Sequence, residues 1–188
     1  MKSGRCFLNL SPTNGKVNMH KIGLLSDTHG WLHPDLFEFF VETDEIWHAG
    51  DIGSMEVAKK LALFKPLKAV YGNIDGGVIR KTFKEVLEFR TEGVDVIMTH
   101  IGGTPGRYNH KISELISSGK PDLFICGHSH IAKVARDPKM GFLYVNPGAA
   151  GYHGFHKYMT AIRFAIDGTE IKDMEIIELG ERGKAIKI

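Results

Sequence analysis

The sequence has little of what marks a secreted, membrane-spanning or nucleic-acid-binding protein. It contains only two cysteines, Cys6 and Cys126, far apart along the chain, so we expect no disulfide framework and a reducing, cytoplasmic compartment. No apolar run reaches the ~20 residues that a helix needs to cross a bilayer. The formal net charge of +2 gives no strong basic field for nucleic acid. Neither a membrane nor a nucleic acid is therefore expected as a partner.

What the sequence does have is a composition typical of one globular domain. Its 188 residues can bury a substantial core, and the 43% hydrophobic and 24% charged content does not suggest disorder. The segment 1–18 is polar, and we expect a flexible leader there, followed by a single domain at 19–188. Ten histidines are many for this length, and they are the unusual feature of the composition.

The first half of the chain alternates short apolar runs with helical patterns. Apolar runs at 21–26, 45–48 and 67–71 predict strands. Pro34 suits the first turn of a helix to about residue 41, and Ser54 is a candidate N-cap for a helix to about residue 64. Three strand–helix units at this spacing predict a βαβ arrangement with partly parallel strands.

The second half has pairs of short apolar segments separated by turns, a pattern typical of β-hairpins. Three hairpins are predicted, formed by segments 86–89 and 94–98, by 131–136 and 142–145, and by 159–166 and 170–179. The third has a strong turn signal at Asp167-Gly168. A helix at about 108–117 and a buried strand at 123–126 are expected between the first two. The predicted fold class is α/β, with two mixed β-sheets packed as a sandwich and flanked by α-helices, in four layers.

Polar side chains follow five of these strands at the point where each strand ends. They are Asp27 and His29, Asp51, Asn73, His100, and the pair His128 and His130. Because ligand sites in α/β folds lie outside the carboxyl ends of strands, five such ends can meet at one crevice. Carboxylate oxygen, amide oxygen and imidazole together suit divalent Mn, Fe, Co, Ni or Zn.

Each cluster alone has an ordinary explanation. Asp27-Thr28-His29 would cap a helix, Gly50-Asp51 and Asn73 would form turns, and His100 would be a hydrogen-bonded core histidine. A lone His-x-His pair such as His128 and His130 is more often structural than functional. It is improbable that all five strand ends carry metal-binding side-chain types by chance. Their occurrence together therefore favours a metal site.

Other polar residues near these strand ends have two open interpretations. His48 precedes the Gly-Asp turn on a buried strand, where a structural role is favoured. Asp75 either holds a metal ligand by a hydrogen bond or shapes a turn. His153 and His156 either border the site or simply lie in a Gly-rich loop.

The ordered series Asp-x-His, Gly-Asp, Gly-Asn, Thr-His and Gly-His-x-His resembles the calcineurin-like metallophosphoesterase superfamily, in its small single-domain bacterial and archaeal phosphodiesterase type. The resemblance covers residue 21 to the C-terminus. It implies two divalent metal ions, with Mn the first choice and Ni, Fe, Co, Zn or Mg as alternatives. One set of implied ligands is Asp27, His29, Asp51 and His130, and the other is Asp51, Asn73, His100 and His128, with Asp51 bridging.

By the same resemblance the expected activity is hydrolysis of a small phosphodiester, through in-line attack of a metal-bridging hydroxide, with Asp51, Asn73 and His100 as catalytic residues. Many members have a histidine after Gly-Asn, where this chain has Ile74. Ile74 cannot protonate a leaving group, which suggests either slower chemistry or a preference for leaving groups of low pKa.

Three alternative functions stay open or lose support. A phosphomonoesterase or nucleotidase would use the same site, and a catalytically weak protein-interaction scaffold would use the same fold. A nuclease lacks support, because the chain has no basic run to hold a polymer. Homo-oligomerisation is left open.

Overall fold

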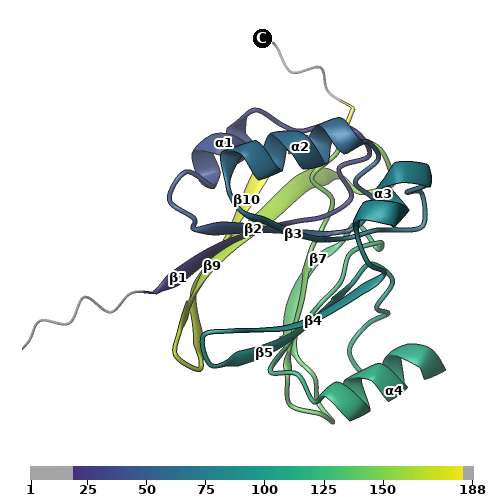
Figure 1. The fold of residues 1–188 in the computed structure, drawn as a ribbon, viewed down its shortest axis with the longest axis vertical. Coiled ribbons are helices and arrows are strands. Elements are labelled where there is room, and N and C mark those ends of the chain that lie inside the picture. Colours follow the sequence, from purple (N-terminus) through teal and green to yellow (C-terminus); the bar gives the residue numbers. More distant parts are fainter. Residues whose placement is uncertain (1–18, 184–188) are drawn as a thin grey trace, which may run out of the picture.

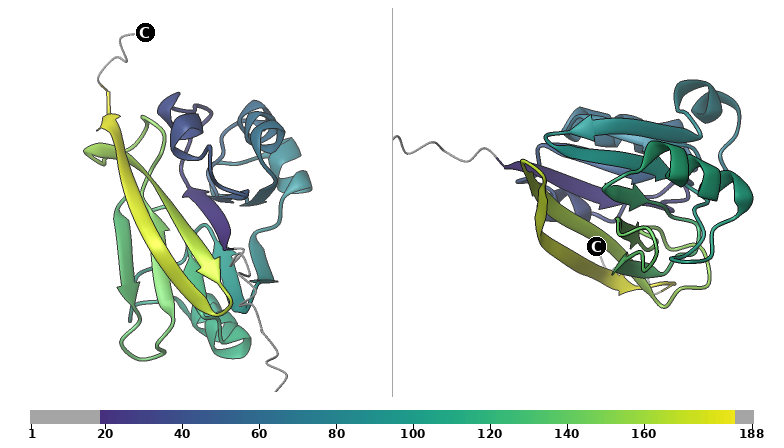
Figure 2. Two further views of the ribbon diagram at one scale, coloured as in Figure 1. Left: turned by 90° about the vertical axis from the view of Figure 1, so that its left-hand side faces the viewer. Right: turned by 90° about the horizontal axis from the view of Figure 1, so that it is seen from below.

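Residues 19–183 are described by a computed structural model, in which ten strands form two five-stranded sheets. The leader predicted for 1–18 lies outside the described residues, so that prediction and the single-domain boundary stay predictions. Both sheets are mixed, as predicted. They stack face to face with the helices on the outside (Figures 1 and 2).

The first sheet has the strand order β10-β9-β1-β2-β3. Its strands are β1 (His20–Leu25), β2 (Glu45–Ala49), β3 (Leu67–Val70), β9 (Tyr158–Asp167) and β10 (Glu170–Glu181). The pairs β1–β2 and β2–β3 are parallel, whereas β9 runs antiparallel to both β1 and β10. The βαβ prediction and the last hairpin are therefore confirmed.

The second sheet has the strand order β4-β5-β6-β8-β7. Its strands are β4 (Val86–Thr91), β5 (Val94–Thr99), β6 (Leu123–Ile125), β7 (Ala132–Arg136) and β8 (Leu143–Pro147). The outer pairs β4–β5 and β7–β8 are the two predicted antiparallel hairpins, and β5, β6 and β8 are parallel. The parallel strands of both sheets bring several carboxyl ends to one edge of the sandwich.

Within residues 19–183, four helices cover the outer faces, α1 to α3 on one side and α4 on the other (Figure 1). They are α1 (Asp35–Phe39), α2 (Met55–Phe64), α3 (Gly77–Thr82) and α4 (His110–Gly119). Ser54 caps α2 as predicted, since its Oγ accepts from Val57 N at 3.3 Å. The helix predicted from about residue 108 begins later, because Asn109 Oδ1 accepts from Ile112 N at 2.9 Å and makes Asn109 the N-cap.

Helix α3 was not predicted, because Gly76 and Gly77 at its start suggest only a turn. None of the helices described here is both long and apolar enough to cross a membrane.

Alternation along the strands divides the buried residues into three clusters. Ile22, Trp47 and Met98 belong to the cluster between the sheets. Their neighbours point outward, Ile46 into a cluster beneath α1 and α2, and Ile97 into one beneath α4. Because successive side chains of a strand face opposite sides, each central strand contributes to two layers.

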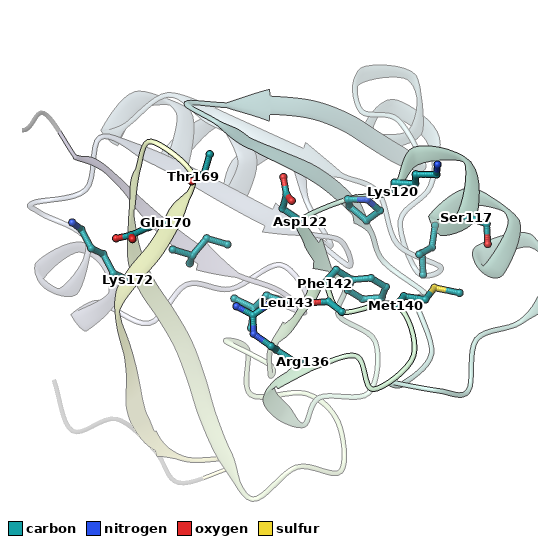
Figure 3. A pocket seen from close by; sticks show the side chains of 14 residues that line it. Ser117, Lys120, Asp122, Arg136, Met140, Phe142, Leu143, Thr169, Glu170 and Lys172 are labelled. Atoms are coloured by element: carbon teal, nitrogen blue, oxygen red, sulfur yellow. Dashed lines mark hydrogen bonds between the residues drawn. The ribbon is translucent and has the colours of Figure 1, made fainter.

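A cavity of about 1010 Å³ lies at a distance from the strand ends that carry the predicted ligands (Figure 3). Lys120 after α4, Arg136 of β7 and Thr169 at the β9–β10 turn contribute to its lining. None of the seven predicted ligands lines it, so its size does not make it the candidate site.

Truncation of Leu61 in α2 tests the packing of this helix on the first sheet. Leu61 is 1% exposed, whereas Leu63 on the same helix is 89% exposed. We expect Leu61→Ala to lower the free energy of unfolding by about 2–5 kcal/mol, the range for a buried leucine. Leu63→Ala should change it by about 0.5 kcal/mol or less. Urea denaturation of the two variants measures this, and equal losses would contradict the assigned faces of α2.

Candidate metal centre

The ends of the five strands β1, β2, β3, β5 and β6 meet at one edge of the sandwich. Backbone hydrogen bonds join the end of β1 to that of β2, and the end of β5 to that of β6. Asp27 N donates to Gly50 O at 2.9 Å within the first sheet. Gly127 N donates to His100 O at 3.0 Å within the second. The two sheets are joined here as well, because His128 N donates to Asp27 Oδ2 at 3.1 Å.

Five of the seven predicted ligands have left-handed backbone, which non-glycine residues rarely adopt. Their φ angles are 55° at Asp27, 49° at His29, 54° at Asp51, 67° at His128 and 58° at His130. Such conformations cost of order 1–3 kcal/mol each and gather at functional sites. The clustering of five in two sheets therefore supports a functional origin for this edge.

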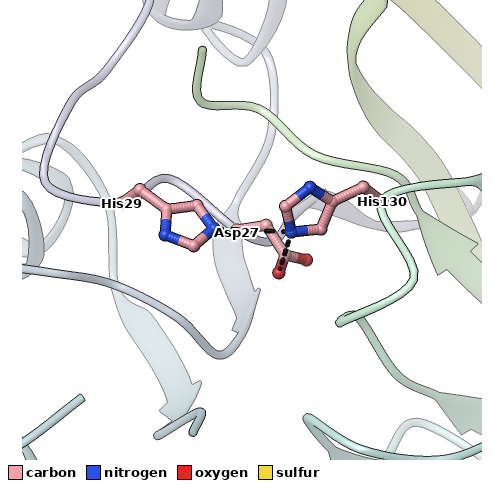
Figure 4. A group of neighbouring side chains, drawn as sticks. All are labelled: Asp27, His29 and His130. Carbon is pink, nitrogen blue, oxygen red and sulfur yellow. Dashed lines mark hydrogen bonds and ion pairs between the residues drawn. The ribbon is translucent and has the colours of Figure 1, made fainter. Parts of the chain in front are cut away.

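The first group of possible ligands consists of Asp27, His29 and His130, which converge although they are distant in sequence (Figure 4). His130 Nε2 lies 3.0 Å from Asp27 Oδ1 and 3.4 Å from His29 Nε2. One ligand atom from each residue lies within 4.8 Å of the other two. This is a spacing at which one cation would touch all three.

The second group consists of Asp27, Asp51 and His100. His100 Nε2 lies 3.3 Å from Asp51 Oδ2 and 3.9 Å from Asp27 Oδ1. The other ring nitrogen, Nδ1, is 2.8 Å from the carbonyl oxygen of Ala49. Since a carbonyl only accepts, Nδ1 carries the proton, and neutral His100 turns an unprotonated Nε2 towards two carboxylates.

Two buried atoms in this arrangement have no hydrogen-bond partner: Asp27 Oδ1 and His100 Nε2. His130 Nε2 is close to Asp27 Oδ1 but does not meet it in hydrogen-bonding geometry. A buried carboxylate oxygen that faces imidazole lone pairs is unfavourable unless a positive charge lies between them. Carboxylates and imidazoles are also suitable donors for a divalent transition metal. The residues present therefore fit a metal ion.

The ionisation of this cluster fits a site that gathers positive charge. Burial opposes protonation of His100, but Asp51 and Asp27 outweigh it and raise the pKa of that imidazole. Burial also works against ionisation of Asp51, yet attraction to His100 and the hydrogen bond from Ile74 N lower the pKa of its carboxyl group. Burial lowers the pKa of His29, which favours its neutral, metal-binding form. A cation bound at His100 Nε2 would stand where a second proton would otherwise bind.

Asn73 and His128, the remaining predicted ligands, lie at the edge of the cluster and are exposed. The His128 ring packs edge-on against His100, with centroids 5.3 Å apart. Both residues line a cavity of about 340 Å³ with His29, Asp51 and His130, while Asn73 also lines a neighbouring one of about 290 Å³ beside His100. All seven residues thus surround one region, with two at its mouth.

Asp75, whose role the sequence left open, holds two loops together beneath the site. Its carboxylate accepts from Ile52 N at 3.0 Å, Gly53 N at 2.7 Å and Gly72 N at 2.8 Å. The residue is 3% exposed. It therefore fixes the loops after β2 and β3, which carry Asp51 and Asn73.

His48 has the structural position favoured by the sequence. It is fully buried, its Nδ1 accepts from Gly50 N at 3.2 Å, and its Nε2 lies 2.9 Å from Thr28 Oγ1. The Thr28 hydroxyl donates to Ile52 O at 2.9 Å, so Nε2 of His48 is the donor to Thr28. Burial lowers the pKa of His48 to about 4.

Sequence reasoning missed Arg80 and undervalued His156. Arg80 lies on the unpredicted helix α3 and donates to the carbonyl oxygens of Gly72 and Asn73 at 3.1 and 3.3 Å. His156 lies beside His130, and burial, together with that neighbour, lowers its pKa. The only available signal was the Gly-rich sequence around His153 and His156.

Comparison with known proteins adds family relationships to this geometry. The model of the calcineurin-like phosphoesterase superfamily domain matches residues 20–169. A protein of Methanothermobacter thermautotrophicus, named a probable metallophosphoesterase, is 28% identical over 164 residues, covering 85% of this chain and 92% of its own length. A probable metallophosphoesterase of Methanocaldococcus jannaschii is 30% identical over 133 residues, covering 68% of this chain and 67% of its own.

Solved structures share the fold at low identity. Vacuolar protein sorting 29 of Cryptosporidium parvum matches with a TM-score of 0.67 and 16% identity, over 85% of this chain and 98% of its own. A structure described as a novel archaeal phosphodiesterase matches with a TM-score of 0.62 and 22% identity, over 84% of this chain and 99% of its own. These similarities confirm the predicted fold class.

Replacement of Asp75 tests whether one carboxylate holds the loops of the site. Asp75→Asn keeps the shape but leaves at least one buried N–H without an acceptor, so we expect a loss of about 1–3 kcal/mol in the free energy of unfolding. The matched control is Asp122→Asn, because exposed Asp122 also accepts a backbone N–H, from Asp95 at 2.9 Å. Its effect should be about 0.5 kcal/mol or less. Urea denaturation in chelator measures both, and equal effects would contradict the role of Asp75.

The buried neutral state of His48 predicts a pH dependence of stability. Its pKa falls from 6.5 to about 4 on folding, so between these values the unfolded chain binds the proton and the folded protein does not. The contribution is fully present above pH 6.5 and is lost as the pH falls, by about 2 kcal/mol at pH 5. His48→Gln retains an amide donor for Thr28 but does not titrate. Between pH 7 and 5 in chelator, wild type should lose about 2 kcal/mol more than this variant, and parallel losses would contradict the assignment.

Proposed function

The chain belongs to the calcineurin-like phosphoesterase superfamily, and from this premise we propose that it is a dinuclear-metal-dependent phosphodiesterase acting on small phosphodiesters. The observation that carries the proposal is the pair of buried, unpartnered atoms Asp27 Oδ1 and His100 Nε2, which face one another across 3.9 Å beside Asp51. Two acidic side chains and several imidazoles gathered without a compensating partner suit bound cations.

In the proposed site one cation would be held by Asp27, His29, Asp51 and His130, and the other by Asp51, Asn73, His100 and His128. Asp51 would thus be shared by the two. Asp51 Oδ2 supports the bridge, because it lies 4.0 Å from His29 Nε2 and 3.3 Å from His100 Nε2, one histidine of each set. This mixed oxygen and nitrogen donor set suits Mn, Fe, Co, Ni or Zn, and the family resemblance makes manganese the first choice.

The chain's own residues supply orientation for in-line attack on phosphorus. When bound, the two dications activate water and offset the charge of the phosphoryl oxygens. Asp51 is held in orientation through Oδ1, which accepts from Ile74 N at 3.0 Å and leaves Oδ2 free. His100 is held by its Nδ1–H bond to Ala49 O, so its Nε2 stays unprotonated. Asn73 at the mouth offers an amide oxygen. These three are the proposed catalytic residues.

The mouth of the site favours a phosphodiester over a phosphomonoester. The exposed apolar residues Ile74, Ile131 and Phe155 line the cavity with the proposed ligands. No lysine or arginine is among the described residues that line it. A diester carries one negative charge, whereas a monoester carries close to two near neutral pH and would be better met by added cations. Ile74 offers no proton to the leaving group, which favours esters of low leaving-group pKa.

A scaffold function is the second candidate, and the same apolar rim favours it. Structural neighbours include vacuolar protein sorting 29 from Cryptosporidium parvum, and exposed Ile131 and Phe155 would suit a protein partner. The presence of all seven proposed ligands favours an enzymatic function over a scaffold function.

Metal-reloading assays test the proposed function. Protein stripped with chelator should regain hydrolysis of aryl phosphodiesters when supplied with Mn, and fall back to background on renewed chelation. Parallel assays with Ni, Fe, Zn and Mg rank the metals, and an aryl phosphomonoester in the same assays should react more slowly than the diester. Inactivity with every metal would favour the scaffold, and a faster monoester reaction would favour a phosphomonoesterase.

Asp51→Asn tests the bridge with little change of shape. We expect turnover to fall to background and one or both cations to be lost on gel filtration, as measured by elemental analysis. The control Asp122→Asn alters an exposed carboxylate outside the site and should retain metal and activity. Wild-type turnover by Asp51→Asn would contradict the proposed bridge.

A further inference from the structure

The loop between β8 and β9 places His156 directly behind His130, on the side away from Asp27. The Nδ1 atoms of the two histidines are 3.2 Å apart, and the ring centroids are 5.1 Å apart at an interplanar angle of 72°. A hydrogen bond between two imidazole nitrogens needs one proton, so one ring donates and the other accepts.

The second nitrogen of His156 decides which ring donates. His156 Nε2 lies 3.1 Å from the carbonyl oxygen of Gly151. A carbonyl cannot donate, so Nε2 carries the proton and neutral His156 has its lone pair on Nδ1. His130 therefore donates from Nδ1, and its Nε2 is left unprotonated 3.0 Å from Asp27 Oδ1.

The backbone of the loop is fixed so that this contact forms. Gly151 N donates to Asp27 O at 3.0 Å. This bond fixes Gly151, whose carbonyl oxygen accepts from His156, against the backbone of the proposed ligand Asp27. Arg182 Nε donates to His156 O at 3.0 Å from just beyond β10. Gly154 crosses the His130 ring at φ 124°, where a Cβ atom would lie 2.1 Å from His130 Nδ1. Only glycine leaves room for this approach.

We infer that His156 is a positioning residue for the cation held by Asp27, His29 and His130. It selects the tautomer and the orientation of His130 through a chain from Gly151 O to His156 to His130. Ligand histidines usually donate their other N–H to an oxygen acceptor, and losing that acceptor typically weakens metal binding by about 10–100-fold. Here an imidazole takes the place of the oxygen. The inference rests on the proposed metal site.

Three variants separate this role from simple packing. His156→Leu fills the space but removes the acceptor. His156→Asn can place its amide oxygen near the position of Nδ1 and so keeps an acceptor for His130. His153→Leu alters a histidine of the same loop that contacts His29 only through ring packing, at 6.1 Å between centroids. Urea denaturation in chelator establishes that each variant is folded.

Competition between the protein and a fluorescent chelator for Mn²⁺ and for Zn²⁺ gives the affinity of each cation. We expect His156→Leu to weaken one of the two binding events about 10–100-fold, with His156→Asn recovering most of it and His153→Leu close to wild type. Unchanged affinity in His156→Leu, or equal weakening in His156→Asn, would overturn the role of His156 while the proposed function stands. Wild-type protein that binds neither metal would overturn both.

Discussion

The burial of the Asp27 carboxylate is the constraint on which the rest of the structure depends. The residue has no exposed surface, yet Oδ1 has no hydrogen-bond partner while Oδ2 accepts from His128 N at 3.1 Å. Removing a carboxylate from water costs several kcal/mol unless a positive charge compensates it. His100 and His130 point nitrogens at the unpaired oxygen, and neutral imidazole supplies no charge. A cation is the compensation that this arrangement suits.

The backbone around Asp27 carries a second unfavourable contribution, because five of the proposed ligands occupy left-handed conformations that are normally found in glycine. A network of ordinary hydrogen bonds opposes it. Asp75 joins the loops after β2 and β3, and His48 with Thr28 joins the loops after β1 and β2. Both residues are buried and neither is a proposed ligand. Neighbours that face the core therefore hold the strained backbone, while Asp27 Oδ1 and His100 Nε2 have no hydrogen-bond partner among the described residues.

Most of the fold and the positions of the ligands follow from local pattern. Strand β6 is a short apolar run, and the polar residues that follow it lie at a strand end whatever the tertiary structure. The strand-end positions of His128 and His130 were therefore predictable. Helix α3 was not, since Gly76 and Gly77 at its start disfavour a helix, and the pattern does not show that Arg80 donates back to carbonyls of the loop before it. The role of His156 was not predictable either. It depends on contacts with Gly151 and with the His130 ring, and no spacing in the sequence encodes the contact with His130.

The site and the sandwich assemble as one unit, because nearly every contact that builds the site joins distant parts of the chain. The bond from His128 to Asp27 spans 101 residues and links the two sheets, and the pair His29–His130 spans the same distance. Such contacts form only when both sheets are packed. A cation bound there would stabilise the folded state alone, since the unfolded chain does not hold these ligands together. Metal affinity would then depend on the packing of the two sheets as well as on the ligands themselves. The segment with His128 and His130 contributes to both, because it joins the two sheets and also supplies two of the proposed ligands.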